Sequence, residues 1–143
     1  MPIDIKTLGG AGFASQCTIY TPPLNLLASP YSSSSTKATG LVLRLRNPAN
    51  DLKLAEKTTS SEGSPTTFVL TLKNVRPADR TDGRKESVVN FEYHWDMTKL
   101  QLNSDDSLDV TARWNQFVPT YRGREDKSGI QLDPSNVTEY VFP

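Results

Sequence analysis

The sequence predicts an all-β domain, and three observations carry that prediction. Apolar residues alternate with polar ones at a period of two in several short segments, and no segment sustains the periodicity of a helix. Proline, glycine and serine separate these segments, as turn residues separate strands. Because a chain of 143 residues is typical of one domain and long polar connections are typical of sandwiches, we expect a single jelly-roll β-sandwich over residues 1–143.

Six strands are expected, at residues 13–20, 41–46, 68–73, 88–95, 108–114 and 138–142. Thr21-Pro22-Pro23 should end the first strand, because proline cannot donate a hydrogen bond to a ladder, and Asn47-Pro48 should close the second. Residues 56–65 and 77–85 are predicted to be long polar loops, since they carry almost no apolar side chains. Asp133-Pro134-Ser135 is expected to start one short helical turn, with Asp as its cap.

Composition excludes several classes of protein. The 16 basic and 16 acidic residues cancel, so no global field attracts a polyanion and no nucleic-acid partner is expected. No apolar run approaches the roughly 18 residues of a membrane span, and the first ten residues resemble neither a secretory signal nor a transit peptide. A single cysteine excludes an internal disulfide and, with a single histidine, a Cys/His zinc site. The sequence therefore predicts a soluble intracellular protein.

Four segments carry a family resemblance: GGAGFAS at residues 9–15, GLVLRLR at 40–46, WNQFVPTYRGR at 114–124 and LDPSNV at 132–137. In order, spacing and chemistry they resemble motifs of the complex I intermediate-associated protein family, assembly factors of NADH:ubiquinone oxidoreductase. The resemblance implies a galactose-binding-domain-like sandwich. The expected location is cytoplasmic or, by the resemblance, mitochondrial, although no transit peptide is visible in this chain. Against the family the chain is short at both ends, and the missing strands would leave sheet edges open to a protein partner or a second copy.

The candidate binding residues are charged or aromatic side chains on strands and at one loop: Arg44, Arg46, Glu92, His94, Tyr121, Arg122 and Arg124. The two strand arginines share one face, where their forked guanidinium groups suit a carboxylate or a phosphate. If Lys73 and Asn90 lie on that face with the Glu-His pair, the sheet presents a charged surface; otherwise it is an ordinary solvated face. The loop around Gly123 should expose two arginines beside an aromatic, or use them to bond its own carbonyls.

No metal, cofactor or catalytic residue is assigned from the sequence. Asp105, Asp106 and Asp109 do not have the spacing of a calcium loop and are expected to form a solvated turn. The phosphate-binding, nucleophile-elbow and zinc-hydrolase motifs are missing from the sequence.

The leading hypothesis is a non-enzymatic binding or assembly module that docks a protein partner through a sheet face and end loops. Two alternatives stay open: a module that binds a carbohydrate or another small ligand, and a small cyclase-like enzyme whose cavity lies in the sandwich and works by shape.

Overall fold

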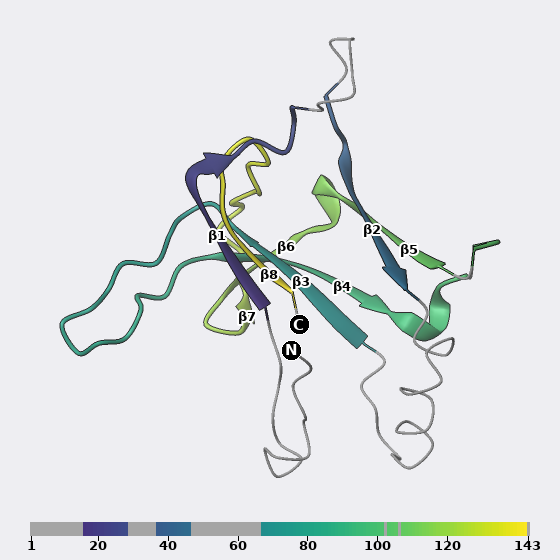
Figure 1. Ribbon diagram of the computed structural model, residues 1–143. Coiled ribbons are helices and arrows are strands. Elements are labelled where there is room, and N and C mark those ends of the chain that lie inside the picture. Colours follow the sequence, from purple (N-terminus) through teal and green to yellow (C-terminus); the bar gives the residue numbers. More distant parts are fainter. Residues whose placement is uncertain (1–15, 29–36, 47–66, 102, 106, 143) are drawn as a thin grey trace.

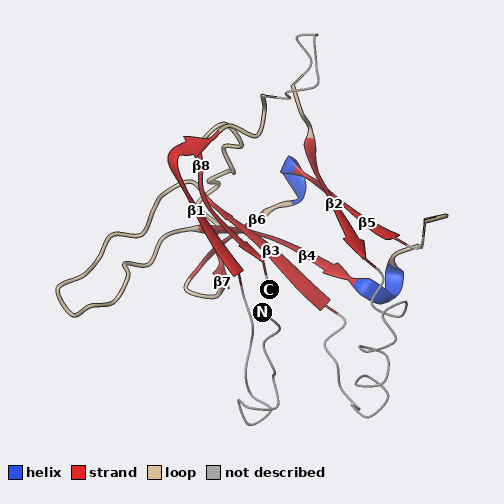
Figure 2. Ribbon diagram, in the orientation of Figure 1, coloured by secondary structure: helices blue, strands red, loops and turns tan. Residues whose placement is uncertain are grey.

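The computed structural model describes residues 16–28, 37–46, 67–101, 103–105 and 107–142. The motif at 9–15, the Asn47-Pro48 strand end and the loop at 56–65 lie outside the described residues. Within the described ranges the chain is almost entirely β, with two short 3-10 turns, Met97–Lys99 and Trp114–Gln116 (Figure 2). No helix in those ranges is long and apolar enough to cross a membrane.

The strands form two antiparallel sheets (Figure 1). The larger has the order β1-β8-β3-β4-β6-β7, and the smaller pairs β2 with β5. Their bounds are Gln16–Leu24 for β1, Gly40–Arg46 for β2, Thr67–Lys73 for β3, Asn90–Asp96 for β4, Ser107–Arg113 for β5, Val118–Tyr121 for β6, Arg124–Glu125 for β7 and Val137–Phe142 for β8.

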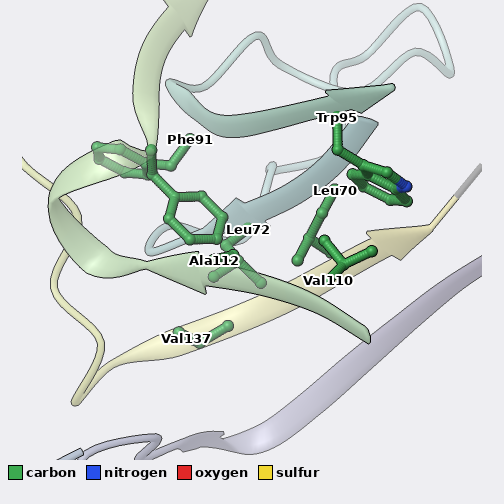
Figure 3. Close-up of a cluster of buried hydrophobic side chains, with 8 residues drawn as sticks. Leu70, Leu72, Phe91, Trp95, Val110, Ala112 and Val137 are labelled. Atoms are coloured by element: carbon green, nitrogen blue, oxygen red, sulfur yellow. The ribbon is translucent and has the colours of Figure 1, made fainter. Parts of the chain in front are cut away.

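The core lies between the two sheets, because each sheet turns its apolar alternating residues inward. Its buried side chains include Leu70, Leu72, Phe91 and Trp95 from the large sheet, and Val110 and Ala112 from the small one (Figure 3). Aromatic stacking extends this core, with the Phe68 and Trp95 ring centres 5.9 Å apart. The predicted all-β sandwich is therefore confirmed, whereas its jelly-roll wiring and galactose-binding-like topology stay predictions.

The first strand differs from the prediction. Thr21-Pro22-Pro23 does not end it, because β1 continues to Leu24 and contains a cis Thr21–Pro22 peptide bond. The pairing of β1 with β8 is irregular between Ile19 and Leu24, where the prolines lie. Since β1 is an edge strand, a proline there removes no hydrogen bond from a central ladder.

Three further differences from the prediction lie in the second half of the chain. Residues 118–121 and 124–125 form a small hairpin, β6–β7, that the alternation did not predict. Asp133 starts a tight turn rather than a helical one: its carboxylate accepts a hydrogen bond from the Ser135 amide at 2.9 Å, and β8 begins at Val137. The expected loop at 77–85 is longer, since it spans residues 74–89 and contains one β-bridge, between Asp79 and Lys85.

Candidate functional site

The predicted site residues fall on opposite sides of the molecule. Arg44 is exposed on the outer face of β2, because Leu43 and Leu45 on either side turn toward the core. Glu92 and His94 lie on the outer face of β4 in the other sheet, whose inward residues are buried in the core. Of the two alternatives that the sequence left open, the one in which a single charged face holds all of them therefore does not occur. Arg46 lies in β2 opposite Ser107, and its side chain is outside the described part of the structure.

Arg44 is occupied by a partner within its own sheet. Its Nε and Nη2 donate to the two carboxylate oxygens of Asp109 at 2.9 and 3.0 Å, across a register pair of β2 and β5. This hydrogen bond is the main cause that raises the pKa of Arg44 and lowers the pKa of Asp109. Asp105 accepts bonds from Ser107, and Asp106 lies outside the described residues. In the described part of the chain no three His, Cys, Asp or Glu side chains form a metal-binding group.

Glu92 joins two neighbouring strands. Thr120 Oγ1 of β6 donates to Glu92 Oε1 at 2.7 Å, and His94 Nε2 lies 3.2 Å from Glu92 Oε2. Both carboxylate oxygens therefore have partners. His94 also borders a hollow of about 460 Å³ at the opposite end of β4, together with Thr67 and Lys99.

The β6–β7 hairpin presents Arg122 in a fixed position. Arg122 and Gly123 form its two-residue turn, with φ angles of 51° and 75°, as a type I′ turn requires at both central positions. Arg122 Nε donates to Ser87 Oγ at 3.3 Å, and its guanidinium carbon lies 5.3 Å from the centre of the Tyr121 ring. Arg124 is exposed on β7, opposite Tyr121. The turn and these two contacts hold the Arg122 guanidinium beside the loop between β3 and β4.

A hollow of about 370 Å³, here called the cationic hollow, opens between the outer face of the large sheet, the 74–89 loop and the β6–β7 hairpin. Four basic side chains line it, and two acidic ones: Lys73, Arg76, Lys85 and Arg122 with Glu86 and Glu139. The loop that supplies one wall projects away from the sheets in Figure 1. Basic side chains thus outnumber acidic ones at this place although the chain as a whole carries no net charge.

A buried ion pair forms the floor of the cationic hollow. Lys73 Nζ lies 2.6 Å from Glu139 Oε1, and these side chains are only 16% and 11% exposed. Cys17 Sγ donates to the same oxygen at 3.3 Å. Burial, and then Glu139, raise the pKa of the Cys17 thiol. Because Glu139 neutralises Lys73, the remaining positive charge of the hollow lies on its wall.

On the wall, Lys85 is bonded to Asp79 at 2.5 Å. Arg76 and Arg122 form no ion pair with any residue in the described ranges. These two guanidinium groups are therefore the ones best placed to receive an anionic group.

A second hollow of about 270 Å³, here called the apolar hollow, adjoins the first. Val75, Val89, Phe91, Tyr121 and Ile130 line it, and Ser87 and Val88 line both hollows. Val75 is 61% exposed, Ile130 45% and Tyr121 40%. The described ranges contain seven exposed large hydrophobic residues, and four of them line the two hollows.

Asn74, the first residue of the 74–89 loop, links that loop to the turn before β8. Its Nδ2 donates to the carbonyls of Asp133 and Asn136 at 2.7 Å each, and its Oδ1 accepts from the Asp133 amide at 2.9 Å. A side chain that satisfies three backbone groups of a remote turn pins the loop at this point.

Sequence reasoning named Arg122 and Tyr121 but missed the residues that make their surroundings. Lys85 belongs to the segment 77–85 that was predicted only as a polar loop, Arg76 lies just before that segment, and Ile130 lies in a stretch without periodicity. The charged residues of that loop were the signal in the sequence that could have identified it as part of a site. Nothing in the sequence shows that the loop lies beside the hairpin.

Comparison with known proteins gives one relative and no family. No family model and no solved structure matches the chain. The chain is similar to an uncharacterized protein of Schizosaccharomyces pombe, with 28% identity over 138 residues, or 96% of this chain and 50% of the relative. The chain thus spans about half the length of the curated relative that it matches.

Proposed function

We propose that this chain is a non-enzymatic docking module that holds a protein partner against the two hollows at the end of the large sheet. The observation that carries the proposal is the gathering of exposed Val75, Tyr121 and Ile130 beside Arg76 and Arg122. Exposed apolar patches bordered by polar groups mark interaction sites, and Tyr and Arg are among the residues that dominate interface energetics.

The resemblance to the complex I intermediate-associated proteins supports the same function from a separate direction. Its most specific segment, residues 117–124, covers the turn of the β6–β7 hairpin that carries Tyr121 and Arg122. We propose on that basis that the partner is a subunit or assembly intermediate of NADH:ubiquinone oxidoreductase, held by a jelly-roll, galactose-binding-like sandwich in the mitochondrion. A second copy of the chain is the alternative occupant.

Cross-linking tests the proposed face directly. The tagged full chain is isolated from respiring cells with its partners, treated with an amine-reactive cross-linker, and its linked peptides are identified by mass spectrometry. Links should concentrate at Lys85, which lines the cationic hollow, and be scarce at Lys99 near the far end of β4.

Paired variants distinguish binding at the docking face from nonspecific binding to any exposed apolar side chain. Val75→Ser with Ile130→Ser should reduce recovery of the partner about tenfold, whereas Val42→Ser, which changes an exposed apolar side chain on the other sheet, should leave it unchanged. Equal recovery with the double variant and with Val42→Ser, or links concentrated on β2 and β5, would contradict the proposed face.

A small-ligand module is the second candidate function, and the size of the cationic hollow favours it. A volume of about 370 Å³ falls in the range of small-molecule sites. A panel of sugars and organic anions tested by thermal shift separates the candidates, because a docking module alone gives no shift with any of them.

A further inference from the structure

We infer that the outer edge of β2 is a second binding site, which takes an extended peptide segment of another polypeptide as a third strand of the small sheet. The segment pairs antiparallel with β2 through its backbone, turns apolar side chains toward the core at alternate positions, and carries acidic side chains at the positions between. The site lies on the small sheet, away from the two hollows, so it does not depend on the proposed docking function.

The backbone of β2 has hydrogen-bonding groups on the side that faces away from β5. The Trp114 amide donates to the Thr39 carbonyl at 3.1 Å, one position ahead of the β2–β5 ladder. In an antiparallel pair, residues that bond across the ladder alternate with residues whose N–H and C=O point away from it. Since the register continues without a bulge, Val42 and Arg44 point their backbone groups outward. No described residue bonds to them on that side.

The other sheet edges of the described structure are obstructed. Pro22 and Pro23 in β1 cannot donate to an added strand, and β7 is only two residues long. The outer edge of β5 bonds to its own chain, because the Thr111 carbonyl accepts from the Tyr93 hydroxyl at 3.1 Å and both backbone groups of Ser107 have partners in the preceding turn. β2 is seven residues long and contains no proline, so its outer edge is the one best suited to strand addition.

An added strand would also cover apolar surface that the small sheet leaves open. Two strands face six, and neighbouring strands lie about 4.8 Å apart, so the small sheet spans about a third of the width of the large one. The outer edge of β5 lies over β4, where Tyr93 reaches it, and the chain just before β2 meets the chain just after β1, where the Ala38 amide donates to the Leu27 carbonyl. The outer edge of β2 is therefore turned toward β8 and β1. Tyr140 and Phe142 of β8 pack against the core but are only partly buried, so apolar side chains of an added strand can complete their burial.

The charge of β2 favours acidic residues at the outward positions of the segment. β2 contains Arg44 and Arg46 and no acidic residue. Opposite charges on neighbouring strands attract, and like charges repel. Asp109 of β5 supplies a counter-charge for Arg44 on one side, and no described strand does so on the other. A second copy of β2 would bring further arginines to the same seam, so a segment with acidic outward residues fits better.

Peptide binding to the full chain tests this inference. The probe is a fluorescent peptide with the central residues Val-Glu-Val-Glu-Val between Gly-Ser flanks. One matched peptide contains Val-Lys-Val-Lys-Val, and another contains Val-Val-Glu-Glu-Val, which keeps the composition and loses the alternation. Fluorescence anisotropy should show the probe binding about tenfold more tightly than either matched peptide.

N-methylated forms of the probe test the backbone pairing. Residues that bond to each other across an antiparallel pair have side chains on the same face of the sheet. Val42 and Arg44 bear outward side chains, so the outward glutamates of the probe should donate to β2 and its valines should not. N-methylation of the two glutamates should therefore abolish binding, whereas N-methylation of the valines should leave it measurable.

Two proline variants of the chain assign the edge. Val42 and Thr111 are register partners, and both direct their N–H groups away from the ladder. Val42→Pro removes a donor from the outer edge of β2 and should weaken probe binding about tenfold, whereas Thr111→Pro, on the outer edge of β5, should leave it unchanged. Circular dichroism checks that both variants are folded. If Val42→Pro is unfolded, the N-methylated probes still decide the question.

Amide hydrogen exchange shows whether the edge is free before the probe binds. In the chain alone, the amides of Val42 and Arg44 should exchange faster than the amide of Leu43, and the probe should slow both. Slow exchange at both in the chain alone would mean that the edge is already paired and would overturn the inference. Equal binding of the alternating and rearranged peptides, or loss of binding on methylating the valines alone, would also overturn it. A concentration-dependent dimer that Val42→Pro abolishes would assign the edge to a second copy instead.

Discussion

The two outer faces of the sandwich differ in how far their charged side chains are paired with one another. On the small sheet, Arg44 and Asp109 stand in register, and both carboxylate oxygens accept from the guanidinium group. On the large sheet, the hollow beside the β6–β7 hairpin holds more basic than acidic side chains, and Arg76 and Arg122 have no ion pair in the described ranges. The Arg44–Asp109 pair on the small sheet satisfies its own charges, whereas two guanidinium groups beside the large sheet have no ion pair within the described ranges.

Burial differs between the faces as well. The Arg44 side chain is 64% exposed, whereas Lys73 and Glu139 are 16% and 11% exposed under the cationic hollow. An exposed ion pair is screened by water and adds little to stability, but breaking a buried pair leaves an uncompensated charge. We therefore expect the Arg44–Asp109 pair to add little to the stability of the fold and the Lys73–Glu139 pair to be needed for it.

The largest expected effect comes from breaking the buried pair. Lys73→Met should lower the free energy of unfolding by about 2–3 kcal/mol, because Glu139 then stays buried without its cation. The melting temperature should fall by about 5–10 °C. Arg44→Met is the matched control on the small sheet and should leave the melting temperature unchanged, since its partner Asp109 is accessible to water.

A double variant shows whether charge or packing is responsible. Lys73→Met with Glu139→Leu should recover most of the lost stability, because the uncompensated carboxylate is gone. Similar losses for Lys73→Met and Arg44→Met, measured by urea unfolding, would erase the proposed contrast between the faces.

An intermediate effect is expected at Gly40, where β2 approaches β5 closely. A Cβ there would lie 2.8 Å from the Arg113 Cα and even nearer to the Ala112 carbonyl oxygen, so the strands would have to separate. Gly40→Ala should therefore cost about 2 kcal/mol, as overpacking does elsewhere. Val42→Ala changes an exposed side chain of the same strand and should cost less.

The Gly40 variant also tests whether the two faces are independent. Hydrogen exchange should become faster at amides of β2 and β5, while binding at the hollows persists below the melting temperature. Loss of partner recovery in folded Gly40→Ala protein would show that the small sheet belongs to the docking surface.

The sequence predicted the central strands well because one face of each strand packs in the core and the other faces water. Phe68, Leu70 and Leu72 alternate with more polar residues, and β3 forms there with the first of them partly buried and the other two fully buried. The β6–β7 hairpin escaped the same method, since four- and two-residue strands are too short to show a period and Pro119 interrupts the first.

The site was only half predictable for a related reason. The glycine turn correctly indicated that Arg122 is exposed, but its partner Ser87 is 35 positions away in the sequence. Alternation tells which face of a strand a charge occupies and not which sheet that strand joins, so the sequence left open whether Arg44 shares a face with Glu92, and the core separates them. Tertiary contacts such as those of Asn74 decide the position of the loop, and local patterns carry no signal for them.

The smallest expected effect is a change in a chemical rate at Cys17, the single cysteine of the chain, which lines the cationic hollow. Burial and the neighbouring Glu139 raise its pKa above the ordinary value of 9.0, so less thiolate is present at pH 8 and alkylation by iodoacetamide should be slower than in the urea-unfolded chain. Glu139→Gln removes a negative charge and leaves Lys73 beside the thiol, so the pKa should fall and alkylation should become faster. Asp109→Asn, on the other sheet, should leave the rate unchanged. If Glu139→Gln slowed the reaction, the carboxylate would not control the thiol, which would contradict the arrangement described for the floor of the hollow. A partner peptide bound in the hollow should also shield Cys17, so the alkylation rate of the unlabelled protein reports whether the proposed docking surface is occupied.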